Sequence, residues 1–117
     1  MKAYISAAEA FSRKGYYSLV VFDGDQEAFE ETGAASSVQE ARERAFFSLL
    51  NWSKVNRARV SLVLRPETEE ALRPLIEKTV ALNVEKSSDT NQKGFLACER
   101  CLESLSEGES LNVDGAL

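Results

Sequence analysis

The chain has 117 residues, enough for one domain with its own hydrophobic core, and its 44% hydrophobic and 28% charged residues are ordinary for a globular protein. Its 14 Lys and Arg against 19 Asp and Glu give a net charge of −5, which argues against binding polyanions over the whole surface. The absence of histidine excludes Ser-His and Cys-His dyads, HExxH zinc sites and imidazole pH switches.

The sequence features that bear on cellular location all favour the cytoplasm. Two cysteines do not form the disulfide framework of a secreted protein, and too few apolar residues precede Glu9 for a signal peptide. The longest apolar run, residues 19–22, is far shorter than the ~20 residues of a membrane span. We therefore expect a cytoplasmic protein with no membrane partner.

Three strands are predicted at the start of the chain. Residues 2–10 alternate loosely, and residues 16–22 are rich in β-branched and aromatic side chains. Asp23-Gly24-Asp25 is a strong hairpin signal, because Asp-Gly tolerates the positive φ of tight turns. Residues 26–32 then return as a third strand, whose glutamates are typical of an edge that avoids pairing with other sheets.

A long helix is predicted next. Ser37-Val38-Gln39-Glu40 has the pattern of a capping box, in which the serine caps the helix and the glutamate reaches back to it. The apolar residues behind it have helical spacing to about Trp52, at positions 38, 41, 45, 46, 49 and 50.

Strands and helices alternate in the remainder of the chain. After a basic connector over 54–59 we expect a strand over 60–64, a short helix over 67–73 with a further turn after Pro74, a strand around Val80, Leu82 and Val84, and a helix capped by Asp89 and ended by Gly108. The sequence thus predicts one domain over residues 1–106 and a flexible acidic tail over residues 107–117.

Several local patterns occur in an order that resembles the ribonuclease H fold. They are Gly15-Tyr16-Tyr17, the Asp23-Gly24 hairpin, the segment 31–36 that leads into the helix, the helix residues Ala41, Ala45, Phe46, Leu49 and Leu50, and Val84-Glu85-Lys86 before the last helix. The resemblance covers residues 2–106. It implies an α/β domain with a five-stranded mixed sheet in the order β-β-β-α-β-α-β-α.

Members of that family that cut nucleic acid use acidic side chains to hold two divalent metals. The matching positions in this chain are Ser6 (or Ala7 if the register slips by one), Arg42, Arg65 and a position near Ala97. Arg42 matches the helix acid because the residues 3, 4, 7 and 8 positions after it are all apolar, whereas Glu40 lies opposite the apolar face. Because guanidinium groups repel Mg²⁺, we expect no catalytic residue, no metal and no cofactor.

Arg42 and Arg65 form a candidate anion site, because arginine forks bind phosphate groups with two hydrogen bonds. The competing interpretation is that each arginine forms a salt bridge with an acid such as Glu9 or Glu99. The connector adds a candidate basic patch, or else an ordinary solvated surface, at Lys54, Arg57 and Arg59.

Two other features are ambiguous. Phe47 lies outside the apolar stripe of its helix, so it marks either a partner surface or a contact with the closing helix. Cys98 and Cys101 form a CxxC pattern inside a predicted helix rather than at its start. That position favours one core cysteine and one incidental neighbour over a redox pair or a zinc site.

Three functional hypotheses follow. The leading one is a non-catalytic module that binds a protein partner or a second copy of itself. The alternative is a nucleic-acid-binding relic of a nuclease that uses Arg42, Arg65 and the connector for phosphates. The third is a residual metal-dependent nuclease that uses Glu9, Glu40 or Glu99.

Overall fold

The computed structural model describes residues 1–10, 12–79, 82–89, 92–105 and 111–113. In chain order the elements are β1 (Lys2–Ala10), β2 (Gly15–Asp23), β3 (Gln26–Ala35), α1 (Val38–Asn56), β4 (Ser61–Leu64), α2 (Pro66–Glu77), β5 (Asn83–Lys86), α3 (Lys93–Leu105) and β6 (Leu111–Val113). The predicted mixed α/β class is confirmed.

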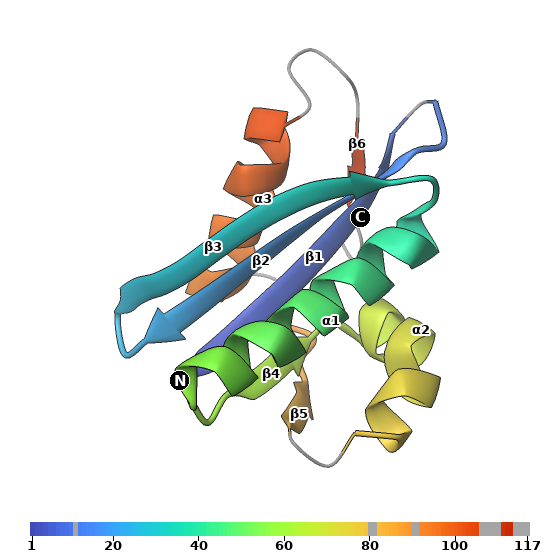
Figure 1. Ribbon diagram of the computed structural model, residues 1–117. Helices are drawn as coiled ribbons and strands as arrows, with labels where there is room; N and C mark the ends of the chain where they lie inside the picture. Colours follow the sequence, from blue (N-terminus) through green and yellow to red (C-terminus); the bar gives the residue numbers. More distant parts are fainter. Residues whose placement is uncertain (11, 80–81, 90–91, 106–110, 114–117) are drawn as a thin grey trace.

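The main path of the sheet runs β3-β2-β1-β4-β5. The first three strands form the predicted antiparallel meander, whereas β4 and β5 add in parallel to the other side of β1 (Figure 1). β4 pairs with the start of β1, and β6 pairs antiparallel with its end, opposite Ala8 to Ala10. The prediction of a flexible tail over 107–117 missed β6; residues 106–110 and 114–117 of that tail lie outside the described residues.

Helices cover both faces of the sheet. α1 and α2 lie on one face and α3 lies on the other (Figure 1). β1 is buried between the two layers: Ala3 and Ile5 pack in the core beneath α1, and Tyr4 packs in the smaller core beneath α3. A strand covered on both faces needs no polar face, which explains why its sequence alternates only loosely.

The ends of α1 follow from local chemistry. The Ser37 hydroxyl accepts a hydrogen bond from the Glu40 amide at 3.1 Å, as the capping pattern predicted. The Glu40 carboxylate does not complete the box, because it bonds to Ser36 and Arg44 instead. At the other end the helix continues to Asn56, beyond the predicted end near Trp52. Arg57 then ends it by adopting a left-handed conformation with φ 50°.

α2 is a single helix rather than a short helix and a separate turn. Pro66 occupies its first turn, where a missing N–H costs nothing, but Pro74 lies inside the helix. The helix continues past Pro74 because Leu75 and Ile76 pack against the core beneath α1. Burial of these side chains outweighs the loss of one backbone hydrogen bond.

The last predicted elements start later than expected. β5 begins at Asn83, and residues 80 and 81 of the predicted strand lie outside the described residues. α3 begins at Lys93 rather than directly after Asp89, and the predicted stop at Gly108 is also outside the described residues. No helix in the described part of the chain is long and apolar enough to cross a membrane.

Two adjacent phenylalanines on α1 allow a matched stability test. Phe46 is 1% exposed in the core, whereas Phe47 is 54% exposed. We expect Phe46→Ala to lower the free energy of unfolding by about 3–5 kcal/mol, through lost burial and a residual cavity. Phe47→Ala should change it by about 0.5 kcal/mol or less. Urea unfolding followed by circular dichroism measures both, and equal losses would contradict this assignment of the core.

Candidate functional site

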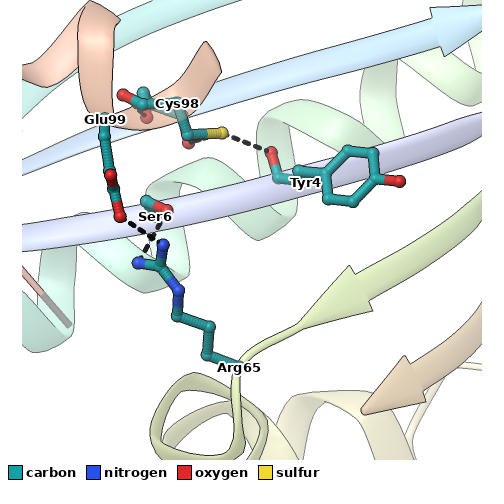
Figure 2. Close-up of polar contacts among 6 residues, drawn as sticks. Tyr4, Ser6, Arg65, Cys98 and Glu99 are labelled. Carbon is teal, nitrogen blue, oxygen red and sulfur yellow. Dashed lines mark hydrogen bonds and ion pairs between the residues drawn. The ribbon is translucent and has the colours of Figure 1, made fainter. Parts of the chain in front are cut away.

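Arg65 is the most unusual residue of the structure, because its charged side chain is buried. It follows the end of β4, directly before α2, and its side chain is only 2% exposed. The guanidinium donates a hydrogen bond to the Ser6 hydroxyl at 3.3 Å and lies 2.5 Å from a Glu99 carboxylate oxygen (Figure 2). It also stacks 4.6 Å from the centre of the Phe95 ring.

These contacts compensate the charge of Arg65. A buried cation is strongly unfavourable without an anion beside it, and Glu99 supplies that anion from α3 while remaining 26% exposed itself. The Phe95 ring adds a cation–π contact on the same helix. The geometry favours the salt-bridge interpretation of Arg65, with Glu99 as its acid, over an anion site.

Two serines line the sheet beneath α3 beside this ion pair. Ser6 of β1 and Ser18 of β2 are directly paired across the strands, and both are fully buried. The Ser18 hydroxyl donates to the Cys98 carbonyl at 2.8 Å. The Cys98 thiol donates to the Tyr4 carbonyl at 3.3 Å (Figure 2). Small polar side chains thus bind the α3 backbone closely to the strands.

The two thiols of the CxxC pattern are in environments that disfavour thiolate. Burial raises the pKa of Cys98 to about 12. Burial and the nearby Glu30 carboxylate raise the pKa of Cys101 to about 11. Cys98 lies in the core beneath α3 and Cys101 packs at its margin, so this pair lacks the low-pKa thiol of a redox CxxC.

Of the other two positions that the resemblance matches to metal ligands, Arg42 lies on a different helix from Glu99, and Ala97 lies two residues before Glu99 on α3. Arg42 is on α1, which packs on the opposite face of the sheet from Ser6. It donates to the Gln39 side chain at 3.3 Å, and Gln39 in turn donates to the Ala71 carbonyl of α2. Ala97 is buried in the core beneath α3. Of the four predicted positions, the structure therefore brings Ser6 and Arg65 into contact. The acid that contacts Arg65 is Glu99.

The acids of the residual-nuclease hypothesis do not assemble. Glu40 is bonded to Ser36 and Arg44 at the start of α1, and hydrogen bonding from Ser36 lowers its pKa. Glu99 is bonded to Arg65. No group of three or more acidic or cysteine side chains able to hold a metal ion occurs among the residues that the structure describes.

The remaining candidates lie on the surface. Lys54, Arg57 and Arg59 are all exposed at the end of α1 and in the connector that follows it. Phe47 is exposed on α1, so a contact with the closing helix is wrong: α3 packs on the other face of the sheet. The interpretation of Phe47 as a surface aromatic remains.

Sequence reasoning identified Ser6 and Arg65 but not the serine partner across the sheet. Ser18 stands alone among apolar residues of β2, which is the signal that marks it. A single hydroxyl in a buried strand needs a hydrogen-bond partner, and a covering helix provides one here.

Comparisons with known proteins identify no relative. No family model matches the chain, and neither the curated proteins nor the solved structures contain a significant match.

Removing the anion of the buried pair should be costly. We expect Glu99→Gln to lower the free energy of unfolding by about 2–3 kcal/mol, because the Arg65 charge stays buried without compensation. Glu69→Gln is the matched control, since it breaks the pair of Glu69 with Arg73 on α2, whose guanidinium-bearing side chain is 53% exposed, and it should cost about 0.5 kcal/mol or less. Urea unfolding of both variants checks this, and equal effects would show that the pair adds nothing.

The thiol environments predict slow chemistry in the folded state. In a Cys101→Ser variant, whose remaining thiol is Cys98, we expect the reaction with a disulfide reagent at pH 8 to proceed at the rate of unfolding. Burial and the raised pKa suppress thiolate until the helix separates from the sheet. Rapid, complete labelling in the absence of denaturant would contradict this account.

Proposed function

We propose that this chain is a non-catalytic domain of the ribonuclease H-like class that works by binding, either to a protein partner or to a second copy of itself, in the cytoplasm. The arrangement of an antiparallel meander, a long helix and parallel strands added beside β1 supports that class. The patterns at Gly15-Tyr16-Tyr17 and Asp23-Gly24 support it in the sequence.

The buried ion pair of Arg65 and Glu99 is the single observation that carries the non-catalytic proposal. In nucleases of this class the middle of the first strand and the end of the fourth carry metal-binding carboxylates. The resemblance assigns Ser6 and Arg65 to those positions, and a hydrogen bond joins the two side chains. A guanidinium held there repels divalent cations, and its own anion already neutralises it.

A binding role also agrees with the surface. Phe47 is a large aromatic side chain left 54% exposed on α1. Aromatic residues are enriched in the cores of protein–protein interfaces. The net charge of −5 favours a protein partner over a polyanion.

The phosphate-binding alternative is weaker because Arg65, one of its two central cations, is compensated by Glu99. It then depends on the exposed connector residues Lys54, Arg57 and Arg59. A variant with all three residues changed to Gln therefore tests the contribution of surface charge to binding and leaves the buried Arg65–Glu99 pair unchanged.

The proposal predicts no cleavage and no salt-sensitive binding of an RNA–DNA hybrid. A labelled hybrid is titrated at low and moderate salt with Mg²⁺ or Mn²⁺, anisotropy is recorded, and the same samples are run on a denaturing gel beside an active nuclease.

Each other outcome has a distinct meaning. Metal-dependent cleavage that Glu99→Gln abolishes would overturn the non-catalytic proposal. Intact strands with salt-sensitive binding, lost in the triple Gln variant, would instead support the nucleic-acid-binding alternative.

A further inference from the structure

A second site lies away from the ion pair, at the opposite end of the Tyr4 side chain. A cavity of about 370 Å³ opens where the start of β1, the turn between β2 and β3, and the first turn of α3 meet. It is at the small end of the range for ligand pockets. Its lining includes Lys2, Tyr4, Phe22, Asp25, Lys93 and Gly94.

Aromatic rings form the walls of this cavity. Tyr4 and Phe22 meet edge to face, with ring centres 6.0 Å apart and an interplanar angle of 85°. Gly94 lets the first turn of α3 pack directly against the Tyr4 ring, because a Cβ at that position would lie only 2.1 Å from the ring. The parts of Tyr4 and Phe22 that remain exposed, 8% and 6%, form an apolar wall against which a flat ligand can pack.

The Tyr4 hydroxyl has no protein partner among the described residues, although the side chain is only 8% exposed. Its ring points away from Arg65 and Glu99 (Figure 2). Tyr4 lines the cavity, where a phenol hydroxyl without a protein partner can donate a hydrogen bond to a ligand. The Tyr4 phenol is protonated at neutral pH, and burial and the Glu85 carboxylate raise its pKa further.

The charges at the rim favour an anion at the α3 end of the cavity. Lys2 and Lys93 contribute two ammonium groups against the carboxylate of Asp25. Lys93 is held over the Phe22 ring at 5.8 Å and donates to the Asp25 carbonyl. The first turn of α3 presents backbone N–H groups without helical partners, which also favour negative charge.

We propose that this cavity binds a small aromatic anion, meaning a flat ring with a hydrogen-bond acceptor and an attached phosphate or carboxylate. The ring packs against Tyr4 and Phe22 and accepts a hydrogen bond from the Tyr4 hydroxyl. The anionic group lies at Lys93 and the first turn of α3, away from the Glu85 side. The proposal is independent of the role of the Arg65 ion pair.

The test is an NMR titration of the full ¹⁵N-labelled chain with four probes. Cytidine 5′-monophosphate carries a ring and a phosphate, nicotinate carries a ring and a carboxylate, cytidine lacks the charge and inorganic phosphate lacks the ring. We expect saturable shifts of the amides of Gly24, Asp25 and Gly94 with at least one of the two ring-bearing anions.

Paired variants assign the contacts. Tyr4→Phe keeps the ring and removes the hydroxyl, and Lys93→Gln removes the charge. Each should weaken binding about five- to tenfold. Tyr16→Phe and Lys54→Gln change the same residue types elsewhere and should leave binding unchanged. The proposal is overturned if neither ring-bearing anion saturates, if inorganic phosphate alone gives equal binding, or if Tyr4→Phe binds as tightly as the parent chain.

Discussion

A guanidinium can be covered by a helix only if an anion lies beside it, and this requirement determines how α3 is placed. Arg65 enters the space beneath α3 from the end of β4, and Glu99 of that helix meets it there. Ser6 takes a further N–H of the guanidinium, and Phe95 covers one of its faces. A rotation of α3 about its axis would separate the charges, so the pair determines the rotational position of the helix as well as its contact with the sheet.

Other contacts beside the ion pair also fix the position of α3 on the sheet. Ser18 and the Tyr4 carbonyl bind the helix at Cys98, one residue before Glu99. Gly94 lets the first turn approach Tyr4 closely, because no side chain separates them. Aromatic contacts at Gly94 and Phe95 are thus followed along the same helix by polar contacts at Cys98 and Glu99. Fixed in this way, the helix also holds the Tyr4 ring at the wall of the cavity beside the start of β1.

Much of the architecture was predictable because it depends on local signals. The meander follows from its hairpin turn and strand composition, and α1 follows from its cap at Ser37 and its apolar spacing. The path of α2 through Pro74 was not predictable, because distant core contacts of Leu75 and Ile76 decide it. β6 was missed for a related reason: a three-residue strand has little periodicity, and it forms only because β1 offers a free edge there.

At the site, sequence reasoning reached two interpretations of Arg65 and could not choose between them. The choice depends on whether Glu99 faces the end of β4, which is set by how α3 lies across β1 and β2. Helical spacing assigned Arg42 to a position relative to the apolar face of α1. It could not show that this face and Ser6 belong to opposite sides of the sheet. Sequence spacing shows which residues share one face of a helix. A functional site also depends on the distances between side chains of different helices and strands, which spacing does not give.

The long stretch of chain between the first two strands and α3 has a consequence for synthesis on the ribosome. Its contacts join residues 80 and 94 positions apart, between Cys98 and the first two strands. While the meander and α1 emerge, one face of the sheet, including Tyr4, Val20 and Phe22, has no cover from the chain itself. At about 5–20 residues per second, this interval lasts for seconds. The nascent protein must pass through it with an aromatic surface open to chaperones or to other chains, until α3 arrives and closes it.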